Sequence, residues 1–402
     1  MTSICEDRMC AGCMACVDIC PTGAVTVDPG IDFYRPAIDR GKCVDCGRCT
    51  QVCQQRNPAE SKEPIAWYQG WALDPAVRAA SSSGGFATAI SRSFVSSGGA
   101  VCACAFSGGR FGFEIVEDLD GVNCFRGSKY VKSDPSGAYG QVRALLRAER
   151  KVLFIGLPCQ VSAMRNFVGE KLQNNLYTID LICHGTPSPQ LLEAFLKECG
   201  SSLSAIRDIT FRRKSNLYDG GIGTMVDELG VIDRYLIAFL NSLDYTENCY
   251  FCTYAGMERV SDLTLGDSWG SELQDEIGSG ISLALCQTEK GEALLHDSEL
   301  KLLPVDVERA VFYNGQLRES PRRSKERDRF LRALAAGETF EQSVAYSLPK
   351  QCLRQGIKRT LLGIGVMKPS ESGYQTTLFS FDEPGVSFAS ECVGDDAQTG
   401  RR

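Results

Sequence analysis

Two short cysteine-rich segments near the start of the chain constrain it more than any other feature. Residues 10–21 read CAGCMACVDICP, residues 43–53 read CVDCGRCTQVC, and both contain the spacing C-x2-C-x2-C-x3-C. Three thiolates spaced in this way hold three corners of a cubane iron–sulfur cluster, while the fourth cysteine points away and ligates a second cluster. We therefore expect two 4Fe-4S clusters. Their ligands are predicted to be Cys10, Cys13, Cys16 and Cys53 for the first, and Cys43, Cys46, Cys49 and Cys20 for the second.

Zinc is the alternative occupant of closely spaced cysteines, but structural zinc sites pair C-x2-C units across longer gaps. Residues 24–30 and 35–41 lie between the two segments and are predicted to form short strands, as in a bacterial-type dicluster ferredoxin fold. Cys5 falls outside the spacing, and we expect it to be a bystander. Residues 54–64 are polar and read as a linker. The predicted dicluster domain therefore covers residues 1–58.

Composition limits the function further. The chain of 402 residues has 20 cysteines but two histidines, so sulfur is the metal ligand that it offers most. Disulfides do not persist in a reducing compartment, and clustered cysteines there indicate metal binding or catalysis. A net charge of −7 argues against a nucleic-acid partner. We find neither a signal peptide nor a membrane-spanning apolar run, and expect a cytoplasmic protein without membrane insertion.

The rest of the chain shows apolar runs that are each followed by a turn and a helical pattern. Strands are expected at 152–155 and 177–182, and Ser188 and Pro189 suit the start of the helix after the second strand. Such alternation predicts an α/β layer with a mainly parallel sheet. The expected fold class is therefore α+β overall: a dicluster ferredoxin fold followed by an α/β body.

Four cysteines of the body fall in three predicted loops. Cys159 and Cys183 follow strand ends, and Cys249 and Cys252 form a C-x2-C pair. Ligands gather beyond the carboxyl ends of parallel strands, so these cysteines could share one crevice. A third iron–sulfur cluster, a zinc site, a redox pair and simple burial all remain open on this pattern.

Two further stretches have residues suited to phosphate binding. Residues 79–95 read AASSSGGFATAISRSFV, and glycines before a helix allow backbone N–H groups to approach an anion. Residues 127–133 read GSKYVKS and add a lysine and serines. An ordinary helix cap and a solvated strand end are the alternatives. The G-x-G-x-x-G fingerprint of a dinucleotide fold is not found after a strand.

Taken together, these motifs resemble the beta subunit of coenzyme F-420-reducing hydrogenase and its dehydrogenase relatives. The matching stretches are SSSGGF, GSKYVKS, VLFIGLPCQVSAMR, DLICHGTPSP, NCYFC, LTLGDSWG and GISLALCQT, over roughly residues 66–290. The resemblance implies a flavin-binding body over residues 64–140 and 141–310, followed by a helical extension and flexible tail over 311–402.

The resemblance also implies cofactors and site residues. The body would hold FAD non-covalently beside a third 4Fe-4S cluster that is ligated by Cys159, Cys183, Cys249 and Cys252. Candidate FAD contacts are Ser82, Ser83, Gly84, Gly85, Ser128 and Lys129. No side chain is indicated as a general acid or base.

These inferences predict an iron–sulfur flavoprotein oxidoreductase. Electrons would pass between a hydride carrier at FAD, for which coenzyme F-420 is the family's usual choice, and the ferredoxin-type clusters. One alternative is a flavin reductase of an organic substrate that is fed by reduced ferredoxin. Others are a non-catalytic relay subunit of a larger redox complex and a zinc-scaffolded binding module. Expected partners are therefore a redox protein or a hydride-carrying coenzyme.

Overall fold

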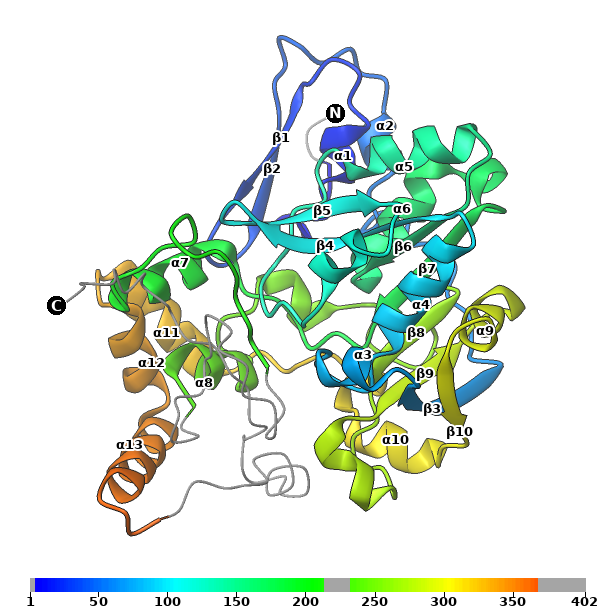
Figure 1. The fold of residues 1–402 in the computed structure, drawn as a ribbon. Coiled ribbons are helices and arrows are strands. Elements are labelled where there is room, and N and C mark those ends of the chain that lie inside the picture. Colours follow the sequence, from blue (N-terminus) through cyan, green and yellow to red (C-terminus); the bar gives the residue numbers. More distant parts are fainter. Residues whose placement is uncertain (1–3, 213–231, 368–402) are drawn as a thin grey trace, which may run out of the picture.

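The computed structural model describes residues 4–212 and 232–367, and its first unit is a small domain built on the two cysteine segments (Figure 1). The two short strands expected here are present as β1 (Val25–Pro29) and β2 (Tyr34–Ile38), and they pair as an antiparallel hairpin. Each cysteine segment contains one short helix, α1 (Ala15–Asp18) or α2 (Arg48–Gln51).

The two cysteine segments have the same backbone conformation. The residues on either side of the second cysteine, Gly12 and Met14, have positive φ values of 62° and 59°. Their counterparts Asp45 and Gly47 have φ values of 49° and 71°. Non-glycine residues rarely adopt this left-handed region. The matching left-handed turns coil each C-x2-C-x2-C run tightly, as a loop that wraps one cluster must.

The body contains an eight-stranded sheet, with the order β10-β3-β9-β8-β7-β6-β4-β5 among the described residues. The strands predicted at 152–155 and 177–182 are present as β6 and β7, and Ser188 caps the following helix by accepting a hydrogen bond from the backbone N–H of Gln190. The strands are β3 (Ala66–Ala72), β4 (Ala100–Ser107), β5 (Arg110–Val116), β6 (Val152–Gly156), β7 (Leu176–Leu181), β8 (Leu263–Asp267), β9 (Ser282–Cys286) and β10 (Leu300–Leu303).

The prediction of a mainly parallel sheet is wrong, because the sheet is mixed. Parallel neighbours occur only at the centre of the described sheet, between β4 and β6, β6 and β7, and β7 and β8. Both flanks are antiparallel: β4 with β5 on one side, and β8, β9, β3 and β10 in succession on the other. The reason lies in the connections. Gly108 and Gly109 join β4 to β5 in a tight turn, and such a turn joins antiparallel strands, whereas parallel neighbours need a long crossover.

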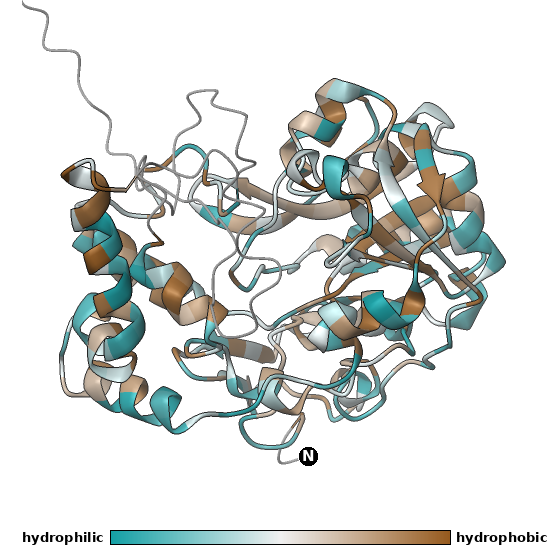
Figure 2. Ribbon diagram, turned by 90° about the horizontal axis from the view of Figure 1, so that it is seen from below, coloured by the Kyte–Doolittle hydropathy of each residue, from teal (hydrophilic) through white to brown (hydrophobic). Residues whose placement is uncertain are grey.

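Helices cover both faces of the sheet. Helices α4 (Phe86–Ser96) and α9 (Glu289–His296) pack on one face with Val101 and Leu153, whereas α5 (Ala138–Arg147) and α6 (Pro158–Val168) pack on the other with Cys102 and Phe154. Alternate residues of each strand therefore pack against the helices on opposite faces of the sheet. Figure 2 shows the strands as a strongly apolar part of the molecule.

A separate group of helices stands beside the sheet (Figure 1). Its apolar core contains Tyr235, Phe330 and Phe340. The expected C-terminal helical extension is part of this group, and the expected flexible tail after residue 367 lies outside the described residues. The helices of the group are α7 (Pro189–Glu198), α8 (Arg234–Leu240), α11 (Lys325–Ala335), α12 (Phe340–Ser347) and α13 (Pro349–Gly363).

The remaining elements are short. They are α3 (Pro75–Ala79), α10 (Val307–Tyr313) and the 3-10 turns η1 (Gly121–Phe125), η2 (Glu170–Leu172), η3 (Glu247–Phe251), η4 (Gln274–Ser279) and η5 (Gly315–Leu317). None of the helices in the described ranges combines the length and the apolar character that crossing a membrane requires.

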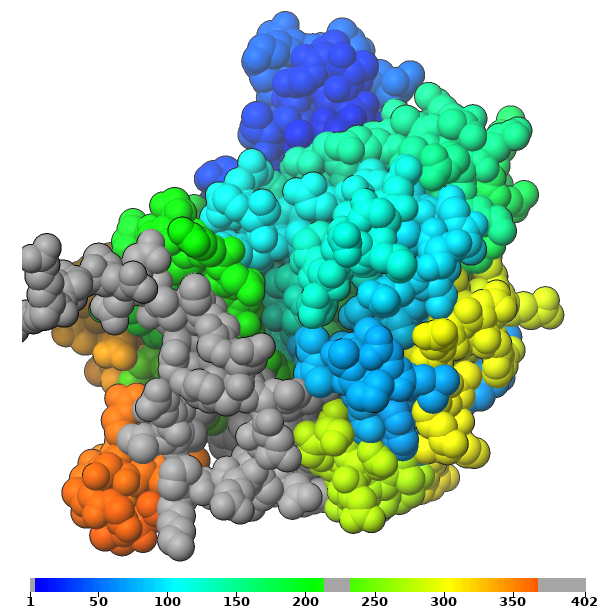
Figure 3. Space-filling view, in the orientation of Figure 1, coloured from blue at the N-terminus to red at the C-terminus, as the bar shows by residue number. Residues whose placement is uncertain are grey.

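The ferredoxin-like domain projects from the body but is firmly attached to it (Figure 3). Tyr139 of α5 donates a 2.7 Å hydrogen bond to the carbonyl of Cys13. The segment expected to be a linker is also fixed, because the N–H of Ala59 donates to Ser162 and the amide of Asn166 donates to the carbonyl of Asn57. The two parts therefore share an apolar core that contains cysteines from both.

Candidate iron–sulfur and flavin sites

The outermost group of cysteines lies at the tip of the ferredoxin-like domain. Cys43, Cys46 and Cys49 line one cavity of about 400 Å³ together with Cys20 from the other segment. This is the grouping that the spacing predicts. The Cys20 sulfur accepts a 3.2 Å hydrogen bond from the N–H of Ala24. Burial raises the pKa of Cys20, but such donors outweigh it, so the net pKa of this thiol is lowered.

A second group lies between this domain and the body. Cys10, Cys13, Cys16 and Cys53 share one core with residues of α5 and α6, and Cys13 is only 8% exposed. Burial raises the pKa of Cys13 to about 12. Burial also raises the pKa of Cys16, and charge on Cys13 and Cys53 adds to the effect. The thiols therefore hold their protons until a metal displaces them.

Cys5 is closer to this group than the sequence suggests. Its side chain is buried, and a hydrogen bond with Cys10 is the first cause that raises its pKa to about 12. A second hydrogen bond, with Cys53, acts in the opposite direction. The residue expected to be a bystander is thus a neighbour of two predicted ligands.

The body brings its four predicted ligands together. Cys159, Cys183, Cys249 and Cys252 all line one cavity of about 560 Å³, a volume that includes space open to solvent. Cys159 lies in the first turn of α6 just after β6, and Cys183 follows the end of β7. Because β6 and β7 are adjacent parallel strands, their carboxyl ends deliver both sulfurs to the same edge.

The four sulfurs line a cavity rather than a single-ion site. Nowhere in residues 4–212 or 232–367 do three or more His, Cys, Asp or Glu side chains approach closely enough to share one metal ion. A cubane cluster has four metal corners and needs one sulfur at each, so its ligands are spread around a larger group. The residues present therefore fit a cluster.

Two buried cations also line the cavity. Lys132 is 2% exposed, and Arg259 donates to the Asp180 carboxylate at 3.1 Å and to the carbonyl of Tyr254 at 2.8 Å. Burial alone would lower the pKa of Lys132, but negative charge on Cys159 and Cys249 outweighs it and raises that pKa. A buried charge needs such compensation. Positive charge therefore faces the four sulfurs.

Lys132 is the site residue that sequence reasoning missed. The stretch GSKYVKS has two lysines; the sequence analysis named only Lys129, as a candidate FAD contact, and made no prediction of a lysine beside the body cysteines. The amino group of Lys129 instead donates to the carbonyls of Phe125 and Arg126, both at 2.9 Å. Its pKa is lowered by burial. Only the strand-end cavity distinguishes the two lysines, and that cavity exists only in the folded chain.

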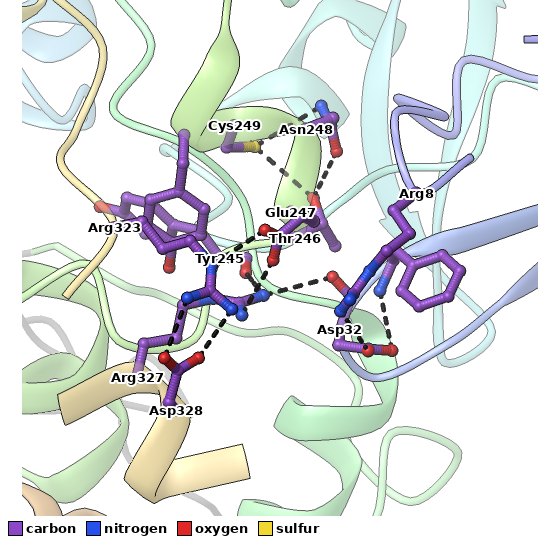
Figure 4. Close-up of polar contacts among 12 residues, drawn as sticks. Arg8, Asp32, Tyr245, Thr246, Glu247, Asn248, Cys249, Arg323, Arg327 and Asp328 are labelled. Carbon is purple, nitrogen blue, oxygen red and sulfur yellow. Dashed lines mark hydrogen bonds and ion pairs between the residues drawn. The ribbon is translucent and has the colours of Figure 1, made fainter. Parts of the chain in front are cut away.

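The loop that carries Cys249 is held from several sides (Figure 4). The N–H of Glu247 donates to the carbonyl of Asp32 in the ferredoxin-like domain at 2.8 Å. The Glu247 carboxylate forms ion pairs with Arg323 at 2.9 Å and with Arg327 at 3.0 Å. Arg327 also donates to the carbonyl of Tyr245 at 3.1 Å. Arg327 of α11 and Arg323 just before that helix thus hold the C-x2-C loop, and the N–H of Glu247 ties the same loop to the ferredoxin-like domain.

The two stretches proposed for FAD meet each other. The N–H of Ser128 donates to the hydroxyl of Ser82 at 2.9 Å, although the residues are 46 positions apart. Gly85 has φ +92° at the start of α4, where a side chain would be strained. Gly84 must be glycine for a different reason, because a Cβ there would lie 2.3 Å from the carbonyl oxygen of Gly70. Ser83 donates to the carbonyl of Ile281 at 2.9 Å.

Comparisons with known proteins agree with the resemblance. Residues 149–304 match the family of C-terminal regions of the beta subunits in coenzyme F420 hydrogenase/dehydrogenase, and residues 9–57 match the family "4Fe-4S dicluster domain". A curated component of the F(420)H(2) dehydrogenase of Methanosarcina mazei is 26% identical over 197 residues, which are 46% of this chain and 55% of that protein. The chain therefore matches about half the length of that relative.

A solved structure shares a loose likeness. The F420-reducing [NiFe] hydrogenase complex from Methanosarcina barkeri contains a chain with 15% identity and a TM-score of 0.43, over 76% of this chain and 95% of that one. A likeness at this level carries no argument about function. The family matches confirm the resemblance: the chain is an iron–sulfur protein related to F420 hydrogenase and dehydrogenase beta subunits.

Proposed function

We propose that the chain is an iron–sulfur flavoprotein oxidoreductase that passes electrons between FAD in its body and the clusters of its ferredoxin-like domain. Cys159, Cys183, Cys249 and Cys252 would ligate the body cluster. Cys10, Cys13, Cys16 and Cys53 would ligate the inner cluster of the domain. Cys43, Cys46, Cys49 and Cys20 would ligate its outer cluster.

The observation that carries this proposal is the order of the three cysteine groups in space. Ala11 and Gln54, which are the chain neighbours of Cys10 and Cys53, line the same cavity as the four body cysteines, so the body group adjoins the inner group. Cys16 of the inner group and Cys49 of the outer group pack in one apolar core, so these two groups adjoin as well. The groups therefore form a row from the body to the tip, as a stepwise path for single electrons requires.

FAD would join the row at the body end. The contact between Ser82 and Ser128, with the N-terminus of α4 beside them, supports a site for its phosphates. A bound flavin supplies the exchange between two-electron hydride transfer and one-electron transfer to a cluster. The protein's contribution is to position the cofactors and to set the charge around the clusters through Lys132 and Arg259.

The hydride partner proposed for FAD is coenzyme F-420, because the relative that matches about half its length with this chain belongs to an F(420)H(2) dehydrogenase. A flavin reductase fed by reduced ferredoxin would use the same row in the opposite direction. A relay subunit of a larger redox complex would use it without turnover of its own. That relative is named as one subunit of its dehydrogenase, which is the reason to keep this last possibility.

Strictly anaerobic purification with analysis of iron, sulfide and flavin tests the proposal. We expect about twelve irons and one FAD per chain, since each of three cubane clusters holds four irons. The reduced protein should then be challenged separately with F-420, NAD and oxidised ferredoxin. About eight irons without flavin would overturn the proposed mechanism, and reaction with ferredoxin alone would select the ferredoxin-linked alternative.

A further inference from the structure

The tip of the ferredoxin-like domain exposes its predicted outer cluster site more than the other two cysteine groups are exposed. Cys46 is exposed, and the neighbouring Val44 is 62% exposed although it is apolar. In contrast, Cys13 and Cys16 of the inner group are 8% and 7% exposed. Electrons that travel along the row would therefore reach the surface here, where a second protein could approach.

Three arginines gather at this end of the molecule. Arg48 lines the cavity of the outer group, and Arg143 and Arg147 belong to α5, which packs against α1 of the ferredoxin-like domain. Burial lowers the pKa of Arg143, and positive charge on Arg147 and Arg48 lowers it further, so the three side chains repel one another. Arg143 is held in place over the ring of Phe167, 4.4 Å from its centre.

Nearby acids do not cancel this charge. Asp39 pairs with Lys42 at 3.5 Å, and Asp45 lies 3.9 Å from Arg40. Within the described ranges, Arg48, Arg143 and Arg147 have no ion pair with an acidic side chain. A chain with net charge −7 thus concentrates arginines without acidic side-chain partners in the described ranges around its most exposed predicted cluster site.

We infer that this tip, defined by Val44, Arg48, Arg143 and Arg147, is the docking surface for an acidic one-electron carrier protein. The inference rests on the proposed function, because it requires a cluster in the outer site. Arginine-rich surfaces steer acidic partners and speed their encounter, and the small apolar Val44 offers a contact beside the electron's exit. The same charge would repel a basic carrier.

The test is the rate of electron exchange between the full cluster-loaded chain and a purified acidic 4Fe-4S ferredoxin. For the native chain, we expect this rate to fall about tenfold as salt rises from about 0.02 to 0.3 M, because salt screens exposed charges. The R48E/R143E/R147E chain should react at least about tenfold more slowly at low salt and show little salt dependence.

Two comparisons keep the test specific. K350E/R354E/R359E on α13 makes the same change in net charge at a different place, and its rate should stay within about twofold of native. R143E/R147E alters only α5 and leaves the cavity of the outer group unchanged, yet it should still slow the reaction severalfold. Equal slowing by the α13 variant, no salt dependence of the native chain, or faster reaction with a basic cytochrome would overturn the inference.

Failure of the proposed function has a different signature. Iron analysis and reduction by methyl viologen, a small molecule that needs no docking surface, are measured for every variant. Missing outer-cluster iron in the native chain contradicts the proposed function itself. Normal iron and normal viologen reduction, with a ferredoxin rate unchanged by the arginine substitutions, contradict only the docking surface.

Discussion

The cysteine groups of the ferredoxin-like domain and of the body both bring four sulfurs together, but they do so in different ways. In the domain, three members of each group lie within seven consecutive residues, and paired left-handed turns bring their sulfurs together. In the body, the members extend from Cys159 to Cys252 and meet only because two parallel strands and a distant loop end at one cavity. A local site therefore depends on backbone conformation, whereas the assembled site depends on the whole fold.

This difference also appears in what supports each group. The outer group has backbone donors from its own segment, such as the N–H of Ala24. The body group relies on residues from far away in the sequence: Lys132, Arg259, and the pair Arg323 and Arg327. Changes remote from the cysteines should consequently harm the body site and spare the domain.

Removal of one ligand from each region is expected to have the largest effect. Cys159→Ser should lose about four irons from the body and leave the two domain clusters intact, whereas Cys46→Ser should lose about four from the domain. Iron and sulfide analysis with electron paramagnetic resonance distinguishes the two. Cys124→Ser removes an exposed cysteine outside all groups and is the control. Full iron content in the Cys159 variant would exclude it as a ligand.

The second-largest effect is expected from removal of Arg327, the α11 residue whose ion pair with Glu247 holds the C-x2-C loop. The side chain of Arg327 is fully buried, and its replacement by methionine leaves the Glu247 carboxylate, 10% exposed, with one partner fewer. Breaking a buried ion pair typically destabilises by about 3–5 kcal/mol. Denaturant unfolding should show a loss of about 3 kcal/mol together with reduced body iron.

The matched control is Arg322→Met, which removes an exposed arginine paired with Glu319. Exposed pairs contribute about 0–1 kcal/mol, so this variant should behave nearly as native. If both variants lose the same free energy of unfolding, the pair between Arg327 and Glu247 is not what supports the body site.

Removal of the buried charge at Lys132 should change potential rather than iron content. Methionine at this position takes a positive charge away from the four sulfurs, so the body cluster should become harder to reduce by about 50–100 mV, which corresponds to about 1–2 kcal/mol for one electron. Redox titration followed by electron paramagnetic resonance measures the shift. Lys132→Arg keeps the positive charge, so its reduction potential should stay close to the native value. Unchanged potentials in Lys132→Met would show that the charge does not act on this site.

The smallest expected effect is a difference in pH dependence between the two regions. Burial raises the pKa of Cys159 and of Cys183, and it raises the pKa of Cys252 to about 11. In the outer group burial raises the pKa of Cys49, but the pKa of Cys20 is lowered. Iron displaces the thiol protons, so occupancy falls as pH falls, and it falls first where the pKa is raised.

Iron-depleted protein reconstituted at about pH 8.5, 7.5 and 6.5 should therefore lose body occupancy before outer-site occupancy. Spectra of separately loaded Cys46→Ser and Cys159→Ser chains distinguish the sites. A loss of both sites at the same pH would contradict the role of burial.

The sequence alone predicted the local parts of the molecule well. The two short strands of the first domain, β6, β7 and the cap at Ser188 were all predicted, because each depends on neighbouring residues. The direction of the flanking strands was not, because it depends on whether a connection is a tight turn or a crossover. Lys132 was missed for a similar reason: nothing in GSKYVKS distinguishes it from Lys129 until distant cysteines surround it.

The ion pairs of Glu247 with Arg323 and Arg327 also determine an order of events during synthesis. Residues 10–53 leave the ribosome long before Arg323 and Arg327 exist, so all eight sulfurs of the first domain are available to a nascent chain. The loop of Cys249 gains its last anchors, to Glu247 and Tyr245, only after the first 322 residues have been made. Assembly of the proposed clusters should thus proceed from the tip inward, with the proposed site of the body completed last.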